Sequence, residues 1–432
     1  MATDISSKPK SNIFRSTRWN EDHSRAKNKN KIQAETVKIS KVFESACSCS
    51  AAKDSYETHL QAKYQKAIKA FEDSGLLFDT TVIDVKASPE VSNYRCHAKL
   101  AVRPAKDSLG APAGKRFAIG LFKPDSHTLV HHIECPLHRD SINTLMPALY
   151  EELEASVLQP YNEETHTGDL RYLAVRASHH TDELMVTFVT THERHRIALK
   201  AMVLRLRQKG LNIVSAHINV NPEETNTIFG TTTKKLVGAN GLRESLCGII
   251  FEIGPTSFFQ INPWQAEAIY RRVEWLAGHA SSGDVAWDLY CGTGQISLLL
   301  AQLGYRTLGI EENPQAIEDA IANVARNQMK DTSPDYIASR VEDLIGRLPT
   351  WSERPSLMVA NPSRRGLAAP ARQLIEEGLK ASPKSRLVYV SCEAETMMRD
   401  LKALSESGQL RQLECFDMFP YTDKLEWIAI VQ

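Results

Sequence analysis

Long apolar segments are missing from this sequence of 432 residues. No apolar run approaches the ~18 residues of a membrane-spanning helix, and residues 1–4 do not begin an apolar stretch typical of a secretory signal. Cysteine is also scarce, with eight residues in the chain, which argues against a disulfide framework. The sequence therefore predicts a cytoplasmic protein with reduced thiols and no membrane contact, and we expect a monomer.

Net charge is absent as well, since 52 Lys and Arg residues balance 52 Asp and Glu residues. The charges are unevenly spread, because residues 1–41 hold ten basic and four acidic residues. Apolar side chains are sparse there, so residues 1–45 are predicted to form a basic, disordered arm. The functional alternative is an arm that contacts the phosphates of a nucleic acid.

Hydrophobic periodicity divides the rest of the chain into three parts. Residues 46–78 contain cysteines followed by an amphipathic helix over residues 55–74. Residues 79–255 show short alternating strands with helices between them, typical of an α+β accessory domain with an antiparallel sheet. Residues 256–432 alternate helix and strand, which predicts a doubly wound, Rossmann-like α/β sheet of seven strands with an antiparallel last strand. The predicted strands are 285–290, 307–311, 336–339, 357–361, 387–392, 412–418 and 427–431.

A glycine-rich loop, Asp-Leu-Tyr-Cys-Gly-Thr-Gly over residues 288–294, spans the end of the first of these strands. Gly292 and Gly294 allow the backbone to approach a ligand closely. Glu311 ends the next strand, where a carboxylate can accept both ribose hydroxyls of an adenosine. A nicotinamide dinucleotide favours a third glycine at position 297, which is serine. S-Adenosylmethionine suits the loop better, and an ordinary turn is the simplest alternative.

Two strand ends and one strand start carry polar or reactive side chains. Cys392 ends a β-branched strand and precedes a helix whose N-terminus would stabilise a thiolate, although neighbouring glutamates oppose this effect. The alternative for Cys392 is a small buried hydrophobic residue. Asn361 opens a polar loop, and its carboxamide can bind an amide edge such as that of uracil; the alternative is a simple turn. Glu426 precedes the last strand, where a solvated residue is the alternative.

Together these motifs resemble those of the RNA uracil-5-methyltransferases that use S-adenosylmethionine. The resemblance extends from Tyr94 to the C-terminus and rests on an ordered set: Ser-Phe-Phe-Gln, Asp-Leu-Tyr-Cys-Gly-x-Gly, Gly-Ile-Glu, Asn-Pro-x-Arg-x-Gly, Tyr-Val-Ser-Cys and Asp-Met-Phe-Pro. It implies that Cys392 is the nucleophile, that Glu426 is the general base, and that Asn361 and Arg364 contact the substrate. The cofactor contacts that it implies are Gln260, Tyr290, Gly292, Gly294, Gln295, Glu311 and Asn361.

The chemistry implied by the resemblance begins with addition of a thiolate to carbon 6 of uracil, which makes carbon 5 nucleophilic. Carbon 5 receives a methyl group, and a base then removes its proton. The target base must leave its stack to reach such a site, and the accessory domain would hold the surrounding RNA. An RNA-binding or RNA-folding protein with a silent cofactor site is the alternative from another class.

Two departures from the family pattern bear on the RNA target. Ser363 stands where many members have the second proline of Asp-Pro-Pro-Arg. Asn361 stands at the first position of this motif, where the branch that modifies 23S ribosomal RNA also has asparagine. Residues 1–45 are too polar for the N-terminal β-barrel module that many members carry. Ribosomal RNA is therefore favoured over transfer RNA.

A third departure concerns the iron–sulfur cluster of several family members. Cys135 lies in a Cys-Pro-Leu segment that matches one ligand position, and Cys49 matches a second, but Cys47 is one residue out of register and Ser40 stands at a further position. Cluster ligation needs four well-placed thiolates, which would require a rearranged set of Cys47, Cys49, Cys96 and Cys135. The alternative is a degenerate remnant without metal, and the methylation steps themselves need no metal.

Overall fold

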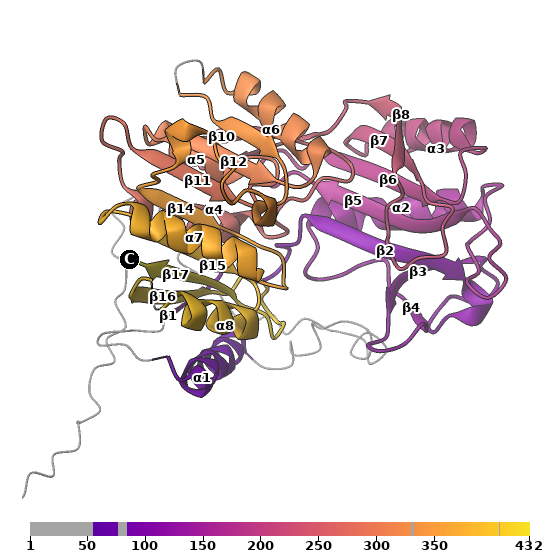
Figure 1. Ribbon diagram of the computed structural model, residues 1–432. Helices are drawn as coiled ribbons and strands as arrows, with labels where there is room; N and C mark the ends of the chain where they lie inside the picture. The colour runs from indigo at the N-terminus through magenta and orange to yellow at the C-terminus, as the bar shows by residue number, and fades with distance from the viewer. Residues whose placement is uncertain (1–54, 77–83, 330–331, 406) are drawn as a thin grey trace, which may run out of the picture. The chain divides into compact units, whose positions relative to one another are not determined.

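The computed structural model describes residues 55–76, 84–329, 332–405 and 407–432 (Figure 1). The predicted basic arm, together with Cys47 and Cys49, lies outside these residues. The first described element is α1 (Tyr56–Ser74), which confirms the amphipathic helix expected from the sequence. Ser55 caps this helix by accepting a hydrogen bond from the backbone N–H of Thr58 at 3.3 Å.

A seven-stranded sheet, here called the accessory sheet, occupies residues 97–238. Its strand order is β4-β3-β2-β5-β6-β7-β8, and all neighbouring pairs are antiparallel except β6 and β7. The exception arises because α3 crosses over between β6 and β7. The elements are β2 (His97–Pro104), β3 (Phe117–Phe122), β4 (Leu129–His131), α2 (Asp140–Glu154), β5 (Leu170–Ala177), β6 (Leu184–Thr190), α3 (Arg196–Gln208), β7 (Ile213–Val220) and β8 (Thr232–Gly238).

A short hairpin follows the accessory sheet and packs into the C-terminal core. It consists of β9 (Leu242–Leu246) and β10 (Ile249–Ile253). Phe251 of the hairpin shares a buried cluster with Ile269 of α4 (Pro263–Ala277) and with Leu298 of the next helix. Asn262 caps α4 by accepting from the backbone N–H of Gln265 at 3.2 Å, as its position before the helix suggests.

The C-terminal half forms the expected doubly wound α/β sheet. The strand order is β1-β16-β17-β15-β14-β11-β12-β13, and β17 is antiparallel to both of its neighbours. The strands of residues 285–431 are β11 (Val285–Leu289), β12 (Arg306–Glu311), β13 (Asp335–Ala338), β14 (Leu357–Ala360), β15 (Arg386–Ser391), β16 (Leu410–Phe416) and β17 (Glu426–Val431). The fold class is therefore confirmed, and the predicted strands lie within a few residues of those observed.

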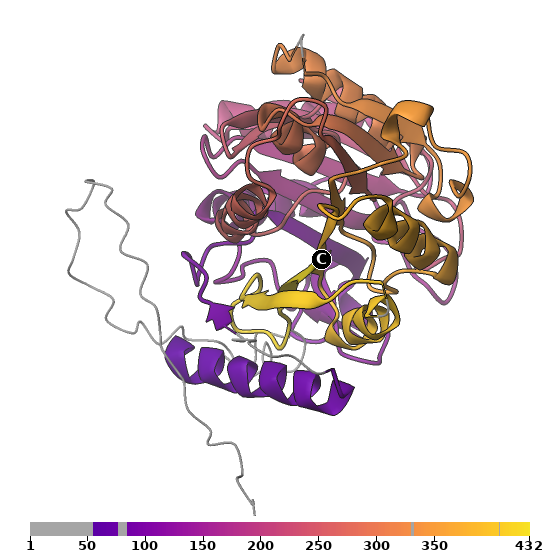
Figure 2. The same cartoon turned by 60° about the vertical axis from the view of Figure 1, so that its left-hand side comes forward.

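The sheet has one more strand than the seven expected. β1 (Asp84–Lys86) pairs in parallel with β16, and Val85 lies opposite Cys415. α1 lies next to β1 and α8 (Ala394–Leu404), at the same edge of the sheet (Figures 1 and 2). The chain therefore begins this sheet, leaves it to form the accessory sheet, and returns to complete it.

Both faces of the parallel strands are buried, as helices on either side of a sheet require. Val285, Trp287 and Leu289 of β11 belong to one core cluster, and Ala286 belongs to the cluster on the opposite face. The remaining helices are α5 (Gln295–Gln302), α6 (Pro314–Arg326) and α7 (Ala369–Ala381). Among the helices of the described residues, none is both long and apolar enough to cross a lipid bilayer.

Candidate active site

Most of the predicted site residues lie along one edge of the sheet, where the parallel strands end. β17, β15, β14, β11 and β12 are consecutive neighbours in the sheet. In that order the strands carry Glu426, Cys392, Asn361, Tyr290 and Glu311 at this edge. Glu426 is the first residue of its strand, Glu311 is the last of its strand, and the other three directly follow theirs. Ligands of doubly wound sheets bind at this edge, where the order of the strands reverses. Here the reversal falls between β11 and β14, the strands that precede Tyr290 and Asn361.

The antiparallel direction of β17 brings the predicted nucleophile and base together. Because β17 runs against β15, the start of β17 lies beside the end of β15. Ser391 pairs with Trp427, so one further step in the register places Cys392 opposite Glu426. The Cys392 side chain is half-buried, and the Glu426 side chain is buried.

Burial controls the proton affinity of both groups. It raises the pKa of the Glu426 carboxyl from 4.5 to about 8. It also raises the pKa of the Cys392 thiol, and the nearby Glu426 raises it further, while the Arg364 guanidinium lowers it. Glu426 and Arg364 therefore both lie close enough to the thiol to act on its charge, and the carboxyl can exchange a proton near neutral pH.

The glycine-rich loop bends sharply toward Glu311. The backbone N–H of Gly292 donates to Oε2 of Glu311 at 3.2 Å, and the N–H of Asn313 donates to Oε1 at 3.0 Å. Gly294 has a φ of +82°, and a Cβ there would lie 2.6 Å from the Tyr336 hydroxyl. Tyr290 also adopts a positive φ, of 64°, which is uncommon for a bulky residue and frequent at functional sites.

A cavity of about 710 Å³ opens beside Tyr290. It is lined by the loops that follow β11, β12, β13 and β14, and it has the size of a small-molecule site. The Tyr290 hydroxyl donates to Glu342 at 3.2 Å. Glu342, Glu312 and Arg340 line this cavity, but the sequence did not single them out because they lie in loops without a motif. A carboxylate-bearing loop, an open polar cavity and positive-φ residues fit the adenosine and methionine portions of S-adenosylmethionine.

Gln260 and Gln295 do not lie at strand ends. Gln295 is buried at the first position of α5. Gln260 acts on the Tyr270 hydroxyl: burial chiefly, together with the charges of Asp288 and Glu426, raises the pKa of Tyr270, and Gln260 lowers it. Gln260 therefore hydrogen-bonds with the Tyr270 hydroxyl, on which the charges of Asp288 and Glu426 also act.

A buried ion pair supports the loop that precedes Glu426. Nζ of Lys63 in α1 lies 2.5 Å from Oδ1 of Asp417, and the two side chains are 3% and 0% exposed. Nζ also donates to the backbone carbonyls of Phe419 at 3.0 Å and Lys424 at 2.9 Å. No local pattern in the sequence indicates this pair, because 354 positions separate its members. α1 thus fixes the loop from which the predicted base emerges.

Two of the four candidate cluster cysteines, Cys96 and Cys135, are among the described residues. Both are buried free thiols. Burial, the largest cause in each case, raises the pKa of both thiols. Cluster ligation stays a prediction, since the other two cysteines lie outside the described residues.

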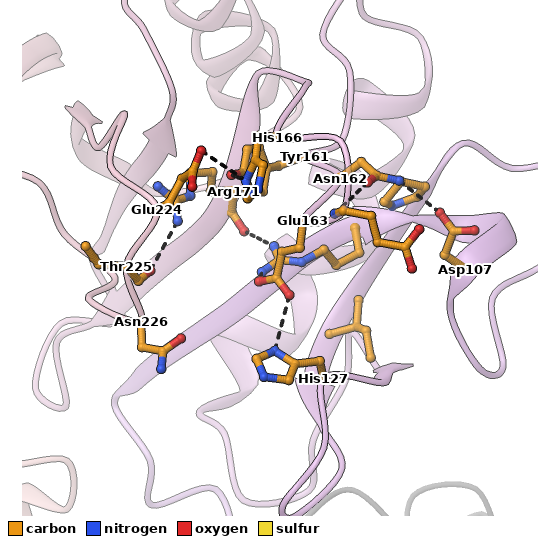
Figure 3. A pocket seen from close by; sticks show the side chains of 14 residues that line it. Asp107, His127, Tyr161, Asn162, Glu163, His166, Arg171, Glu224, Thr225 and Asn226 are labelled. Carbon is orange, nitrogen blue, oxygen red and sulfur yellow. Dashed lines mark hydrogen bonds and ion pairs between the residues drawn. The ribbon is translucent and has the colours of Figure 1, made fainter.

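A second cavity, of about 420 Å³, lies on the accessory sheet (Figure 3). Two buried arginines, Arg103 and Arg171, stack against the Tyr161 ring at 5.6 and 4.7 Å from its centroid. Much of the polar lining is paired within the cavity; for example, Nδ1 of His127 lies 3.4 Å from Oε2 of Glu163. None of the residues predicted for catalysis lines this cavity.

The sequence matches known proteins over most of its length. Residues 55–339 and 353–431 match the family described as tRNA (Uracil-5-)-methyltransferase. An uncharacterized RNA methyltransferase of Oceanobacillus iheyensis is 32% identical over 384 residues, which cover 87% of this chain and 79% of that protein. One of Listeria innocua is 31% identical over 405 residues, which cover 93% of this chain and 85% of that protein.

A solved structure shares the fold. The tRNA (uracil-54, C5)-methyltransferase of Pyrococcus abyssi, in complex with S-adenosyl-L-homocysteine, superposes with a TM-score of 0.71 at 24% identity. The alignment covers 90% of this chain and 86% of that one. Fold and site define a methyltransferase with a doubly wound sheet. The chain belongs to the family of S-adenosylmethionine-dependent RNA uracil-5-methyltransferases.

Proposed function

We propose that this enzyme methylates carbon 5 of a uridine in RNA through a transient covalent bond between Cys392 and the base. The observation that carries the proposal is the placement of Cys392 opposite Glu426 at the edge of the sheet. The cavity beside Tyr290 and the loop of Arg364 lie along the same edge. A thiol, a carboxyl group of raised pKa and a cofactor cavity are the parts that the reaction needs.

The reaction begins when the Cys392 thiol loses its proton to water and the thiolate bonds to carbon 6 of uracil, which opens the double bond between carbons 5 and 6. Carbon 5 becomes an enolate carbon. S-Adenosylmethionine supplies the methyl group when it is bound. Glu426 then removes the proton from carbon 5, the double bond re-forms, and the bond between sulfur and carbon 6 breaks.

Protonation of the two side chains sets the pH range of this cycle. With a pKa of about 8, Glu426 is mostly protonated at pH 7 in the free enzyme, and it must release this proton to water before it can act as the base. A protonated carboxyl does not repel the forming thiolate, and the Arg364 charge favours it. A base whose pKa lies close to the working pH can both take up and release a proton during each turnover.

For the RNA target we propose large-subunit ribosomal RNA, modified by a monomeric enzyme. Asn361 at the start of its loop, together with the polar segment of residues 1–45, supports this choice. Transfer RNA is the second candidate, because the description of the matching family and the name of the Pyrococcus abyssi enzyme both specify transfer RNA. Mapping of 5-methyluridine by mass spectrometry, in both RNA classes from a deletion strain, separates the two candidates.

The covalent step is tested with two substitutions. Glu426→Gln should retain nucleophilic addition but lose proton removal, so a covalent protein–RNA adduct should accumulate and appear as a slow band on a denaturing gel. Cys392→Ala should bind RNA but form neither adduct nor product. Glu393→Gln, which changes the half-buried neighbour of Cys392, and Cys247→Ala, which changes a cysteine in another core cluster, are the matched controls. Normal methylation by Cys392→Ala would refute the covalent mechanism.

A further inference from the structure

A compact group of potential metal ligands lies away from the catalytic edge. It consists of His179 and His180, in the turn between β5 and β6, and Glu244 of β9. Each residue offers one ligand atom, and these atoms all lie within 4.8 Å of one another. A tetrahedral ion with bonds of about 2.1 Å holds its ligands about 3.4 Å apart. Small side-chain rotations therefore suffice for all three to bind one ion.

The contact between His179 and Glu244 needs a proton or a metal ion between its two atoms. Nδ1 of His179 lies 2.8 Å from Oε1 of Glu244, and the two side chains are 4% and 2% exposed. The contact lacks hydrogen-bond geometry, and Nδ1 has no hydrogen-bond partner. Burying these atoms so close together is unfavourable unless a proton or a metal ion binds between them.

Backbone groups around the site orient Glu244 and His180. Glu244 accepts from the backbone N–H groups of His179 at 2.8 Å and Ser245 at 3.0 Å. Nε2 of His180 lies 3.2 Å from the carbonyl oxygen of Ser245. A carbonyl only accepts, so Nε2 carries the proton and Nδ1 of His180 carries the lone pair. Such backbone contacts behind the ligands are typical of metal sites.

We propose that His179, His180 and Glu244 bind one divalent transition-metal ion, with water as the fourth ligand. Two imidazole nitrogens and one carboxylate oxygen, completed by water, suit Zn²⁺. This set differs from the four thiolates of an iron–sulfur cluster and shares no residue with them. The ion would join the β5–β6 turn of the accessory sheet to the hairpin that packs into the C-terminal core.

Cobalt titration of the full-length, untagged and chelator-treated protein tests the site. Co²⁺ should bind once per chain with visible absorption of a tetrahedral ion, and Zn²⁺ should displace it. His179→Ala and Glu244→Gln should each weaken Co²⁺ binding at least about tenfold. Cys96→Ser, which changes a buried thiol outside the ligand set, should leave Co²⁺ affinity unchanged.

The control is His192→Ala, which removes a histidine that contacts a different carboxylate, Asp169, at 2.9 Å. His192→Ala should leave Co²⁺ affinity unchanged. His180→Ala replaces an exposed side chain and should preserve folding, so it tests the site even if the buried variants fail to fold. Absence of saturable binding, or equal weakening in His180→Ala and His192→Ala, would show a simple His–Glu ion pair and overturn the proposal.

Discussion

Glu426→Gln should change the pH dependence of stability as well as the chemistry. Between pH 4.5 and about 8 the unfolded carboxyl is ionised while the buried one keeps its proton. The folded state then binds more protons, so the stability of the native enzyme falls as pH rises through this window. The difference between 4.5 and about 8 corresponds to about 5 kcal/mol above pH 8, and to about 3 kcal/mol at pH 7. Glutamine does not titrate and removes this dependence.

Urea denaturation at pH 5, 6, 7 and 8, followed by circular dichroism, measures the effect. Relative to the native enzyme, Glu426→Gln should gain stability steadily as pH increases. A fixed penalty of about 1–3 kcal/mol for burying an amide shifts every point equally and leaves the slope unchanged. Glu377→Gln, on an exposed part of α7, is the control. A constant difference between Glu426→Gln and the native enzyme across this pH range would refute the assigned burial of the base.

Two further substitutions test the support of the site. Lys63→Met leaves Asp417 buried without its charged partner and should lower the free energy of unfolding by about 3–5 kcal/mol. The control Lys66→Met breaks an exposed ion pair and should change the free energy of unfolding by at most about 1 kcal/mol. Equal effects of the two variants in urea denaturation would contradict the role of the buried pair. Gly294→Ala should weaken binding of S-adenosylhomocysteine at least tenfold in calorimetry because its Cβ would clash with the Tyr336 hydroxyl and displace the loop. The control Gly283→Ala, at a similarly positive φ in open space, should bind normally. If both variants bind alike, the glycine-rich loop does not hold the cofactor.

The positions of the candidate site residues at the ends and starts of strands could be predicted from the sequence because the signals are local. A β-branched run that ends at Cys392, and an apolar run that begins after Glu426, identify strand ends without knowledge of their neighbours. The short connection between the last two strands also predicts that they are antiparallel. That direction is what brings the two residues to one edge.

Other parts depend on contacts between distant segments and leave no local signal. β1 has only three residues, too few for a periodic pattern, and it becomes a strand only by pairing with β16. The Lys63–Asp417 pair lies in two unrelated segments, and a single lysine on an amphipathic helix normally predicts a solvated position. The β9–β10 hairpin alternates like the strands before it, but its apolar side chains pack into the C-terminal core.

The return of the chain to its starting sheet gives the accessory sheet two covalent attachments. One precedes β2, and the other follows β8. Residues 256–432 expressed alone would lack both α1 and the edge strand, so the loop that precedes Glu426 would lose its anchor. Recombination between relatives at the two attachments, in contrast, would exchange accessory sheets while every strand of the doubly wound sheet stayed in place.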